Sequence, residues 1–147
     1  MRAPYQVLVI PFRHTSAGIE VAVLRRPNSQ MWQFVSGGGE DDERPIEAAQ
    51  REVQEEVNLN VNGRLRKLDA MATIPACVFR DVASWANDLL IVPEHSFAID
   101  VKDADLAISA EHEELRWVAS DQANDLLTWD SNKTALWELC ERLKRGL

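Results

Sequence analysis

The chain is poor in positive charge, in cysteine and in long apolar runs. It has 16 Lys and Arg against 24 Asp and Glu, for a formal charge of −8. Nonspecific binding to nucleic acid needs clustered cations, so this balance argues against a nucleic acid partner. Two cysteines exclude a disulfide scaffold and favour a reducing, cytoplasmic location. No apolar run approaches the roughly 20 residues that cross a bilayer, so we expect no membrane segment and no secretory signal.

What is present points to one folded unit. The 147 residues, of which 46% are hydrophobic, are enough to build one core. The sequence has no repeat, no low-complexity segment and no linker, and it predicts a single domain over residues 1–147. Runs rich in Val and Ile between turn-forming residues predict strands over residues 6–12, 19–24, 32–35, 65–79, 88–99 and 115–118.

Three segments have helical patterns, over residues 45–57, 120–127 and 131–143. The first has Pro45 in its first turn, where the missing N–H costs nothing, and apolar residues at helical spacing after it. The second has Ser120 or Asp121 as its cap, and the third an apolar stripe with basic residues in its last turns. This order of elements predicts an α/β (α+β) domain with a mixed sheet sandwiched between helices.

The acidic charge is concentrated in the first helical segment. Residues 40–56 hold eight acids and two bases, and so carry six of the eight net negative charges. On a helix, Glu52, Glu55 and Glu56 project within a sector of about 100°. Three carboxylates on one face repel each other, whereas hard divalent cations bind oxygen ligands of this kind. The alternative is a solvated acidic helix with ordinary ion pairs, such as one between Glu47 and Arg51.

The same segment contains a spaced motif. Gly37 is followed by five residues and Glu43, then by seven residues and the run REVQEEVNL that starts at Arg51. This resembles the Nudix hydrolase signature G-x5-E-x7-R-E-U-x-E-E-x-G-U, in which U is a bulky aliphatic residue. Asn58 stands where the family has Gly, and Asn is the residue that next best tolerates a left-handed helix end. The resemblance covers the Nudix box, residues 37–59, and implies the Nudix fold.

The resemblance also implies the chemistry: hydrolysis of a phosphoanhydride with Mg²⁺ (or Mn²⁺) as cofactor and a glutamate as proton acceptor. Glu52 and Glu56 are the implied main ligands and Glu55 the next, while the backbone at Gly37 can approach the metal closely. Arg51 is implied to pair with glutamates of the motif, chiefly Glu43, and so to fix the glycine loop.

A second segment also resembles the family. Glu111-His112 precedes a strand that contains Trp, and in several Nudix enzymes such a Glu approaches the metals as a further ligand or base. Glu111 is therefore a candidate catalytic and metal-binding residue, the alternative being an ordinary turn acid. We expect His112 to be a structural hydrogen-bonding residue.

The segments around Arg25-Arg26, Trp32-Gln33 and residues 127–132 resemble the bacterial dihydroneopterin triphosphate pyrophosphatase branch, which also acts on dATP. The branch has TGSVE where this chain has SGGGE. The alternatives are structural roles: Ser131 can cap a helix, and Arg25 can be a surface charge. Trp85 is a candidate for stacking on a substrate ring, whereas Trp32, Trp117 and Trp137 are expected in the core. The substrate contacts implied by this branch are Arg2, Arg25, Ser36, Ser131 and Asn132.

Together these features predict an enzyme that releases pyrophosphate and a monophosphate from a nucleoside or pterin triphosphate. One alternative is a hydrolase of dinucleoside polyphosphates or of RNA 5′ ends. An alternative of another class is a non-catalytic nucleotide-sensing domain, although such domains usually lose the motif glutamates that this chain keeps. The expected partner is a small nucleotide, and a monomer and a homodimer are both open.

Overall fold

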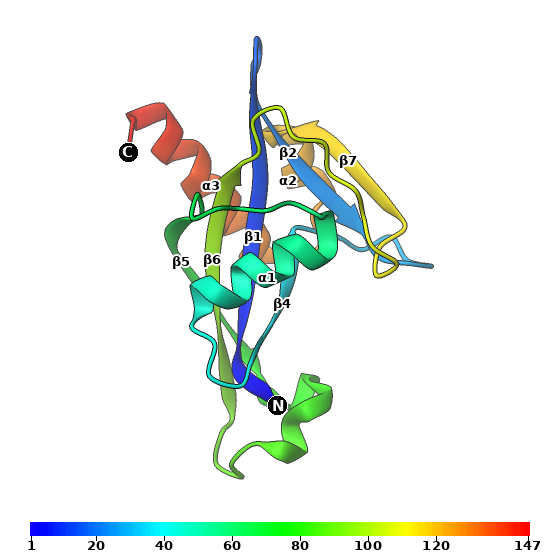
Figure 1. Ribbon diagram of the computed structural model, residues 1–147, viewed down its shortest axis with the longest axis vertical. Coiled ribbons are helices and arrows are strands. Elements are labelled where there is room, and N and C mark those ends of the chain that lie inside the picture. The colour runs from blue at the N-terminus through cyan, green and yellow to red at the C-terminus, as the bar shows by residue number, and fades with distance from the viewer.

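The computed structural model describes all residues, 1–147 (Figure 1). It contains seven strands, three α-helices and two short 3-10 helices. The strands are β1 (Arg2–Thr15), β2 (Gly18–Arg25), β3 (Trp32–Gln33), β4 (Val35–Glu40), β5 (Arg66–Pro75), β6 (Ile91–Asp100) and β7 (Glu114–Ala119). The helices are α1 (Pro45–Val57), α2 (Ser120–Leu126) and α3 (Asp130–Arg145), with η1 (Ala76–Val78) and η2 (Arg80–Ser84) between β5 and β6.

Strand β1 is the centre of the sheet. The strand order is β3-β2-β1-β6-β5, with β4 also paired to β1 and β7 to β2. Because β1 is 14 residues long, its second half pairs with β2 while its first half pairs with β4. The β1–β6 pair is parallel and the others are antiparallel, so the predicted mixed sheet is confirmed.

Helices cover both faces of this sheet, as predicted (Figure 1). Successive side chains of a strand point to opposite faces. Val7 and Val9 of β1 therefore pack with α1, while Leu8, Ile10 and Phe12 pack with α2 and α3. The two resulting cores hold α1 and α3 in place on either side of β1. No helix has both the length and the apolar character needed to cross a membrane.

Several predicted strand boundaries were wrong. The strand predicted over residues 65–79 ends at Pro75, which lacks an amide hydrogen to extend the ladder, and the 3-10 turns follow. Its partner, predicted over 88–99, runs from Ile91 to Asp100. The strand predicted over 32–35 is broken at Phe34, because the amide of Phe34 donates to Asn132 Oδ1 (2.9 Å).

Two details of the helices were also wrong. Neither Ser120 nor Asp121 caps α2, whose N-cap is Ala119, and the Gln122 side chain accepts the Ala119 amide at 3.4 Å. Trp137 is 63% exposed. The stripe of α3 that enters the core contains Leu136 and Leu139, and Trp137 lies outside this stripe and faces outward. Trp32 is buried as expected.

Candidate active site

The three successive glycines lie within strand β4 and not in the expected loop. None of them has a positive φ, so conformational freedom is not their role. A Cβ at Gly37 would lie 2.1 Å from Glu52 Cδ, and one at Gly38 would lie 1.8 Å from Arg2 Cζ. The glycines therefore make room for two charged side chains that lie directly against the β4 backbone.

Arg51 connects β4 to the acidic face of α1. Its guanidinium donates to both carboxylate oxygens of Glu43 (2.9 and 3.0 Å), as the sequence predicted, and to the carbonyl of Gly38 (2.8 Å). It also donates to Glu52 (3.0 Å) and Glu55 (3.2 Å). Hydrogen bonding to Arg51 lowers the pKa of Glu43. The expected Glu47–Arg51 pair does not form, because Glu47 turns back to Arg44.

Two carboxyl groups of α1 are buried, although acidic side chains on a helix are ordinarily exposed to solvent. Glu52 is 8% exposed and Glu56 is 1% exposed. Burial, then repulsion from Glu52 and Glu111, raises the pKa of Glu56 to about 9. Burial also raises the pKa of Glu52 to about 7, although Arg51 opposes this shift. Arg51 contacts Glu52 but not Glu56, so both acids of the pair ionise readily only when a further positive charge lies beside them.

Glu56 is fixed by neighbours from two other segments. The amide of Ser36 donates to its Oε2 at 3.0 Å, and His112 Nδ1 lies 3.5 Å from its Oε1. Burial lowers the pKa of His112 while it raises that of Glu56, so this contact joins two neutral groups and not an ion pair. Neither ring nitrogen of His112 has a hydrogen-bond partner, so its expected hydrogen-bonding role was wrong.

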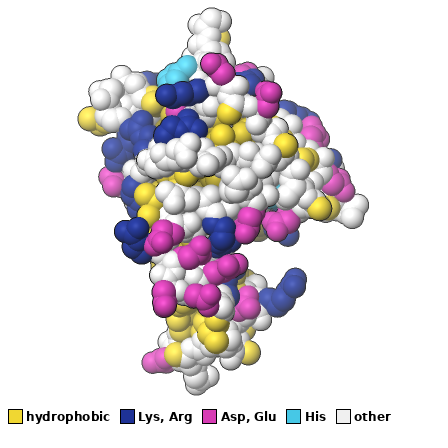
Figure 2. All heavy atoms as spheres, viewed as in Figure 1, with side chains coloured by type: hydrophobic (Ala, Val, Ile, Leu, Met, Phe, Trp, Pro, Cys, Tyr) yellow, Lys and Arg dark blue, Asp and Glu magenta, His cyan; other side chains and the backbone are white.

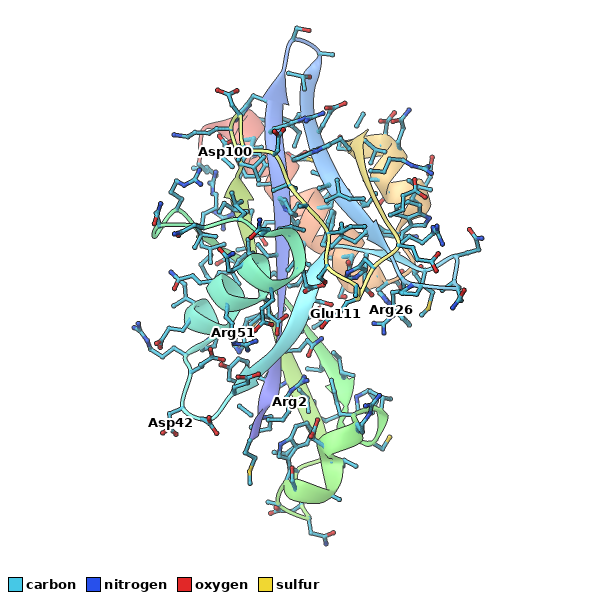
Figure 3. All side chains as sticks on the ribbon, turned by 45° about the vertical axis from the view of Figure 1, so that its right-hand side comes forward. Arg2, Arg26, Asp42, Arg51, Asp100 and Glu111 are labelled. Atoms are coloured by element: carbon cyan, nitrogen blue, oxygen red, sulfur yellow. The ribbon has the colours of Figure 1, made fainter.

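Glu55 and Glu111 border the buried pair from exposed positions. Figure 3 shows Glu111 in the loop beside the C-terminal end of α1. Arg51 lies on α1 itself, nearer the middle of the helix. Repulsion from Glu111 contributes to the raised pKa values of both Glu52 and Glu56. Acidic side chains, with basic ones among them, gather around α1 and the turn before it (Figure 2).

This donor set fits a hard divalent cation. No three His, Cys, Asp or Glu side chains form a ready-made cage. Mg²⁺, however, usually binds one or two carboxylates and keeps several waters. Glu52 and Glu56 supply two buried carboxylates whose mutual repulsion a cation would relieve, and Gly37 leaves the Glu52 side chain the room it needs.

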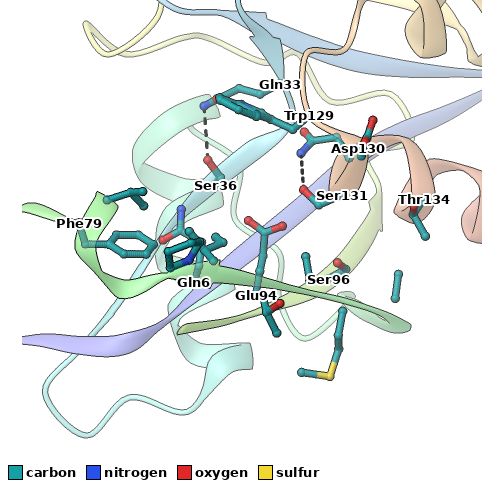
Figure 4. A pocket seen from close by; sticks show the side chains of 18 of the residues that line it. Gln6, Gln33, Ser36, Phe79, Glu94, Ser96, Trp129, Asp130, Ser131 and Thr134 are labelled. Atoms are coloured by element: carbon teal, nitrogen blue, oxygen red, sulfur yellow. Dashed lines mark hydrogen bonds between the residues drawn. The ribbon is translucent and has the colours of Figure 1, made fainter. Parts of the chain in front are cut away.

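A cavity of about 870 Å³ lies beside these acids (Figure 4). Ser36 joins the two regions, since it lines the cavity and its amide bonds Glu56. Apolar side chains, among them Phe79 and Trp129, form part of the wall. Its polar lining includes Gln6, Arg26, Gln33, Glu94, Ser96, Ser131 and Asn132.

Three of the five predicted substrate residues line the cavity, namely Ser36, Ser131 and Asn132. Arg2 lies beside it, with its guanidinium 5.1 Å from the centre of the Phe79 ring. Arg25 does not line it, because its guanidinium is held by Glu113 (3.0 Å), Glu114 (3.5 Å) and the Ser29 carbonyl. Its neighbour Arg26, which has no ion pair, faces the cavity instead.

Trp85, the candidate for stacking on a substrate ring, does not line this cavity. Its indole N–H donates to the Arg2 carbonyl (2.8 Å), and it packs edge-on against Phe79 outside the cavity. Sequence reasoning also missed Gln6, Glu94 and Trp129 as cavity residues. A polar residue at an inward-facing position of a strand, such as Glu94 in β6, is the signal that could have found one of them.

Comparisons with a family model, with curated proteins and with solved structures bear on the family of this chain. The sequence-family model described as the NUDIX domain matches residues 4–137 of this chain. Dihydroneopterin triphosphate diphosphatase of Haemophilus influenzae is 28% identical over 123 residues, covering 82% of this chain and 78% of that protein. The Escherichia coli K12 protein of the same name is 26% identical, with coverages of 92% and 91%. A crystallised candidate NUDIX hydrolase of Listeria monocytogenes is 49% identical, with a TM-score of 0.89 and coverages of 98% and 97%.

Proposed function

The chain belongs to the Nudix family of pyrophosphohydrolases, and from that premise we propose that its 147 residues act as one catalytic domain on a nucleoside or pterin triphosphate. Water attacks the α-phosphorus, the bond from that phosphorus to the bridging oxygen breaks, and pyrophosphate leaves with a monophosphate as the other product. The two relatives named for dihydroneopterin triphosphate support a pterin substrate.

One observation carries the proposal: a buried carboxylate pair adjoins a cavity large enough for a bicyclic ring. Glu52 and Glu56 lie on one side of Ser36, and the cavity lies on the other. A triphosphate attached to a ring could thus place its ring in the cavity and its phosphates beside the acids. An acidic surface alone would repel such a substrate, so a cation must stand between them.

Members of this family generally use divalent cations. Glu52 and Glu56 are the residues that would hold Mg²⁺ or Mn²⁺ here, with Glu55, Glu111 and the Gly37 backbone as further oxygen ligands. A bound cation would neutralise phosphate oxygens and lower the pKa of the attacking water. Arg51 acts as a positioning residue, because it holds Glu52 and Glu55 while it ties α1 to β4.

Two arginines can bind the phosphates and exposed acids can take the proton. Arg2 lies against the β4 backbone and interacts electrostatically with Glu52, and Arg26 is free of ion pairs. Guanidinium groups match phosphate geometry with two parallel hydrogen bonds. Glu111, which is exposed and repels both buried acids, is the candidate to accept the proton of the attacking water, with Glu55 as the alternative.

The test is release of pyrophosphate from dihydroneopterin triphosphate, dATP and dGTP, with and without Mg²⁺, by wild type and by Glu56→Gln. Glu47→Gln is the matched control, since Glu47 lies on the same helix but pairs with Arg44 away from the buried acids. We expect Mg²⁺-dependent release by wild type and by the control. For Glu56→Gln we expect a loss of about a hundredfold or more, as for removal of one electrostatic catalytic group.

Other outcomes would point to other functions. Release of ATP from diadenosine tetraphosphate, without pyrophosphate release from any triphosphate, would indicate a dinucleoside polyphosphate hydrolase. Nucleotide binding without turnover of any anhydride would indicate a sensing domain. Near wild-type activity in Glu56→Gln would place the catalytic metal site elsewhere in the chain.

A further inference from the structure

Glu94 of strand β6 is a buried acid that the catalytic chemistry above does not use. It is 6% exposed, and its Oε1 has no hydrogen-bond partner. Burial raises the pKa of Glu94, and a hydrogen bond with Ser131 offsets only part of that shift. Leaving a buried polar atom unpaired typically costs about 1–3 kcal/mol. A buried group of this kind needs a partner, which a ligand or a water in the cavity can supply.

The neighbouring strands leave space around this carboxyl group. Glu94 pairs with Gln6 of β1 on one side and with Ala72 of β5 on the other. Because paired residues point to the same face, Gln6 lies beside Glu94 while the short Ala72 leaves the other side open. In Figure 4 the Glu94 carboxyl group points into the cavity on the side of Ser131, and Gln6 lies next to it.

The hydrogen bonding of Gln6 determines what it can offer a ligand. Its Oε1 accepts a hydrogen bond from Arg2 Nη2 at 2.5 Å. The Gln6 amide nitrogen is therefore the donor that remains for a ligand in the cavity. Glu94 in its ionised form offers two acceptor oxygens. The wall of the cavity thus presents two acceptors beside one donor.

We propose that Glu94 and Gln6 recognise the 2-amino-4-oxopyrimidine edge that guanine and the pterins share, a specificity that rests on the proposed triphosphatase function. This edge presents two adjacent N–H donors, from the amino group and the ring nitrogen, followed by a carbonyl acceptor. The two donors face the Glu94 carboxylate and the carbonyl faces the Gln6 amide. Charge-assisted pairs of this bidentate kind are among the strongest in proteins.

Adenine does not fit the same arrangement. Its corresponding edge offers one amino donor beside a ring nitrogen that only accepts, so one Glu94 oxygen would face a lone pair. The Glu94 carboxylate therefore selects the ring that carries both an amino and an oxo group. A Gln at this position would lose that selectivity, because its amide has one donor and one acceptor and can also pair with adenine. A good bidentate contact discriminates between bases by about one to two orders of magnitude.

The substitution that tests this proposal is Glu94→Gln, which keeps the size of the side chain. We expect kcat/KM for dGTP and dihydroneopterin triphosphate to fall by about 10- to 100-fold, with dATP changed less than about threefold. Inorganic tripolyphosphate, which has no ring, reports on the catalytic site alone. Glu141→Gln on the outer part of α3 is the matched control, since Glu141 pairs only with Lys144 and Arg145. Thermal unfolding checks that each variant is folded.

Binding to metal-free protein separates this proposal from the catalytic one. Calorimetric titration should show GMP binding at least tenfold more tightly than AMP in wild type, and no such preference in Glu94→Gln. If that preference is present but wild type cleaves no triphosphate, the ring site stands and the proposed reaction fails. If GMP and AMP bind equally to wild type, or if Glu94→Gln reduces turnover of dGTP and dATP equally, the ring assignment is overturned.

Discussion

Replacing Glu56 by Gln should stabilise the metal-free protein while it removes activity. The pKa of Glu56 is raised to about 9 in the fold, against 4.5 for an ordinary glutamate. The folded state therefore binds more protons than the unfolded state between these values, and stability falls as pH rises through this window. At pH 7, which is 2.5 units above 4.5, the loss is at most about 3.4 kcal/mol at 1.36 kcal/mol per unit.

Glu56→Gln removes this titration and keeps an oxygen to accept the Ser36 amide. In EDTA, the variant should unfold up to about 7–14 °C above wild type at pH 7, with the difference shrinking toward pH 5 and growing toward pH 8. Glu47→Gln, a change at a half-exposed position of the same helix, should show no such pH-dependent gain. Saturating Mg²⁺ should remove the advantage by stabilising wild type alone. A variant no more stable than wild type at pH 8 would refute this reasoning.

Three further substitutions test the supports of the site. Arg51→Lys should lower kcat by tenfold or more with a smaller change in KM, because an ammonium group cannot hold Glu43 and the Gly38 carbonyl together; steady-state kinetics would contradict this if kcat were unchanged. Gly37→Ala should greatly weaken Mg²⁺ binding in calorimetry, because its Cβ would lie 2.1 Å from Glu52 Cδ, and unchanged affinity would disprove the close approach. Asn58→Gly should change the free energy of unfolding in urea by less than about 1 kcal/mol, because the residue already adopts a left-handed conformation at φ 56°; a loss of 2 kcal/mol or more would contradict that assignment.

The sequence predicted a structural feature well where residues close together in the chain determine it. Helix α1 begins at Pro45 and ends at Val57, as its apolar spacing and its Pro indicated. The pairing of Arg51 with Glu43 also followed from the motif. Asn58 ends the helix in the left-handed conformation expected for its position. Each of these features depends on residues close together in the sequence.

Features that depend on contacts between distant segments could not be predicted from the sequence. Adjacent residues at the end of a strand face opposite ways, so the pattern could not decide between Arg25 and Arg26 as the one that enters the cavity. The break at Phe34 requires Asn132, which lies in α3. The burial of Glu56 likewise depends on His112 and on the β4 backbone, and neither is near it in the chain.

The central claim is that Glu52 and Glu56 form a buried acid pair made to hold a divalent cation. Titration calorimetry of Mg²⁺ or Mn²⁺ into EDTA-treated, dialysed protein, in buffers of different ionisation enthalpy, measures cation binding and proton release together. With pKa values of about 7 and about 9, the pair should release about 1.5 protons at pH 7, because ligands must deprotonate to bind metal. Glu56→Gln should reduce that release to about half a proton. Binding without proton release, or no binding at all, would contradict the account.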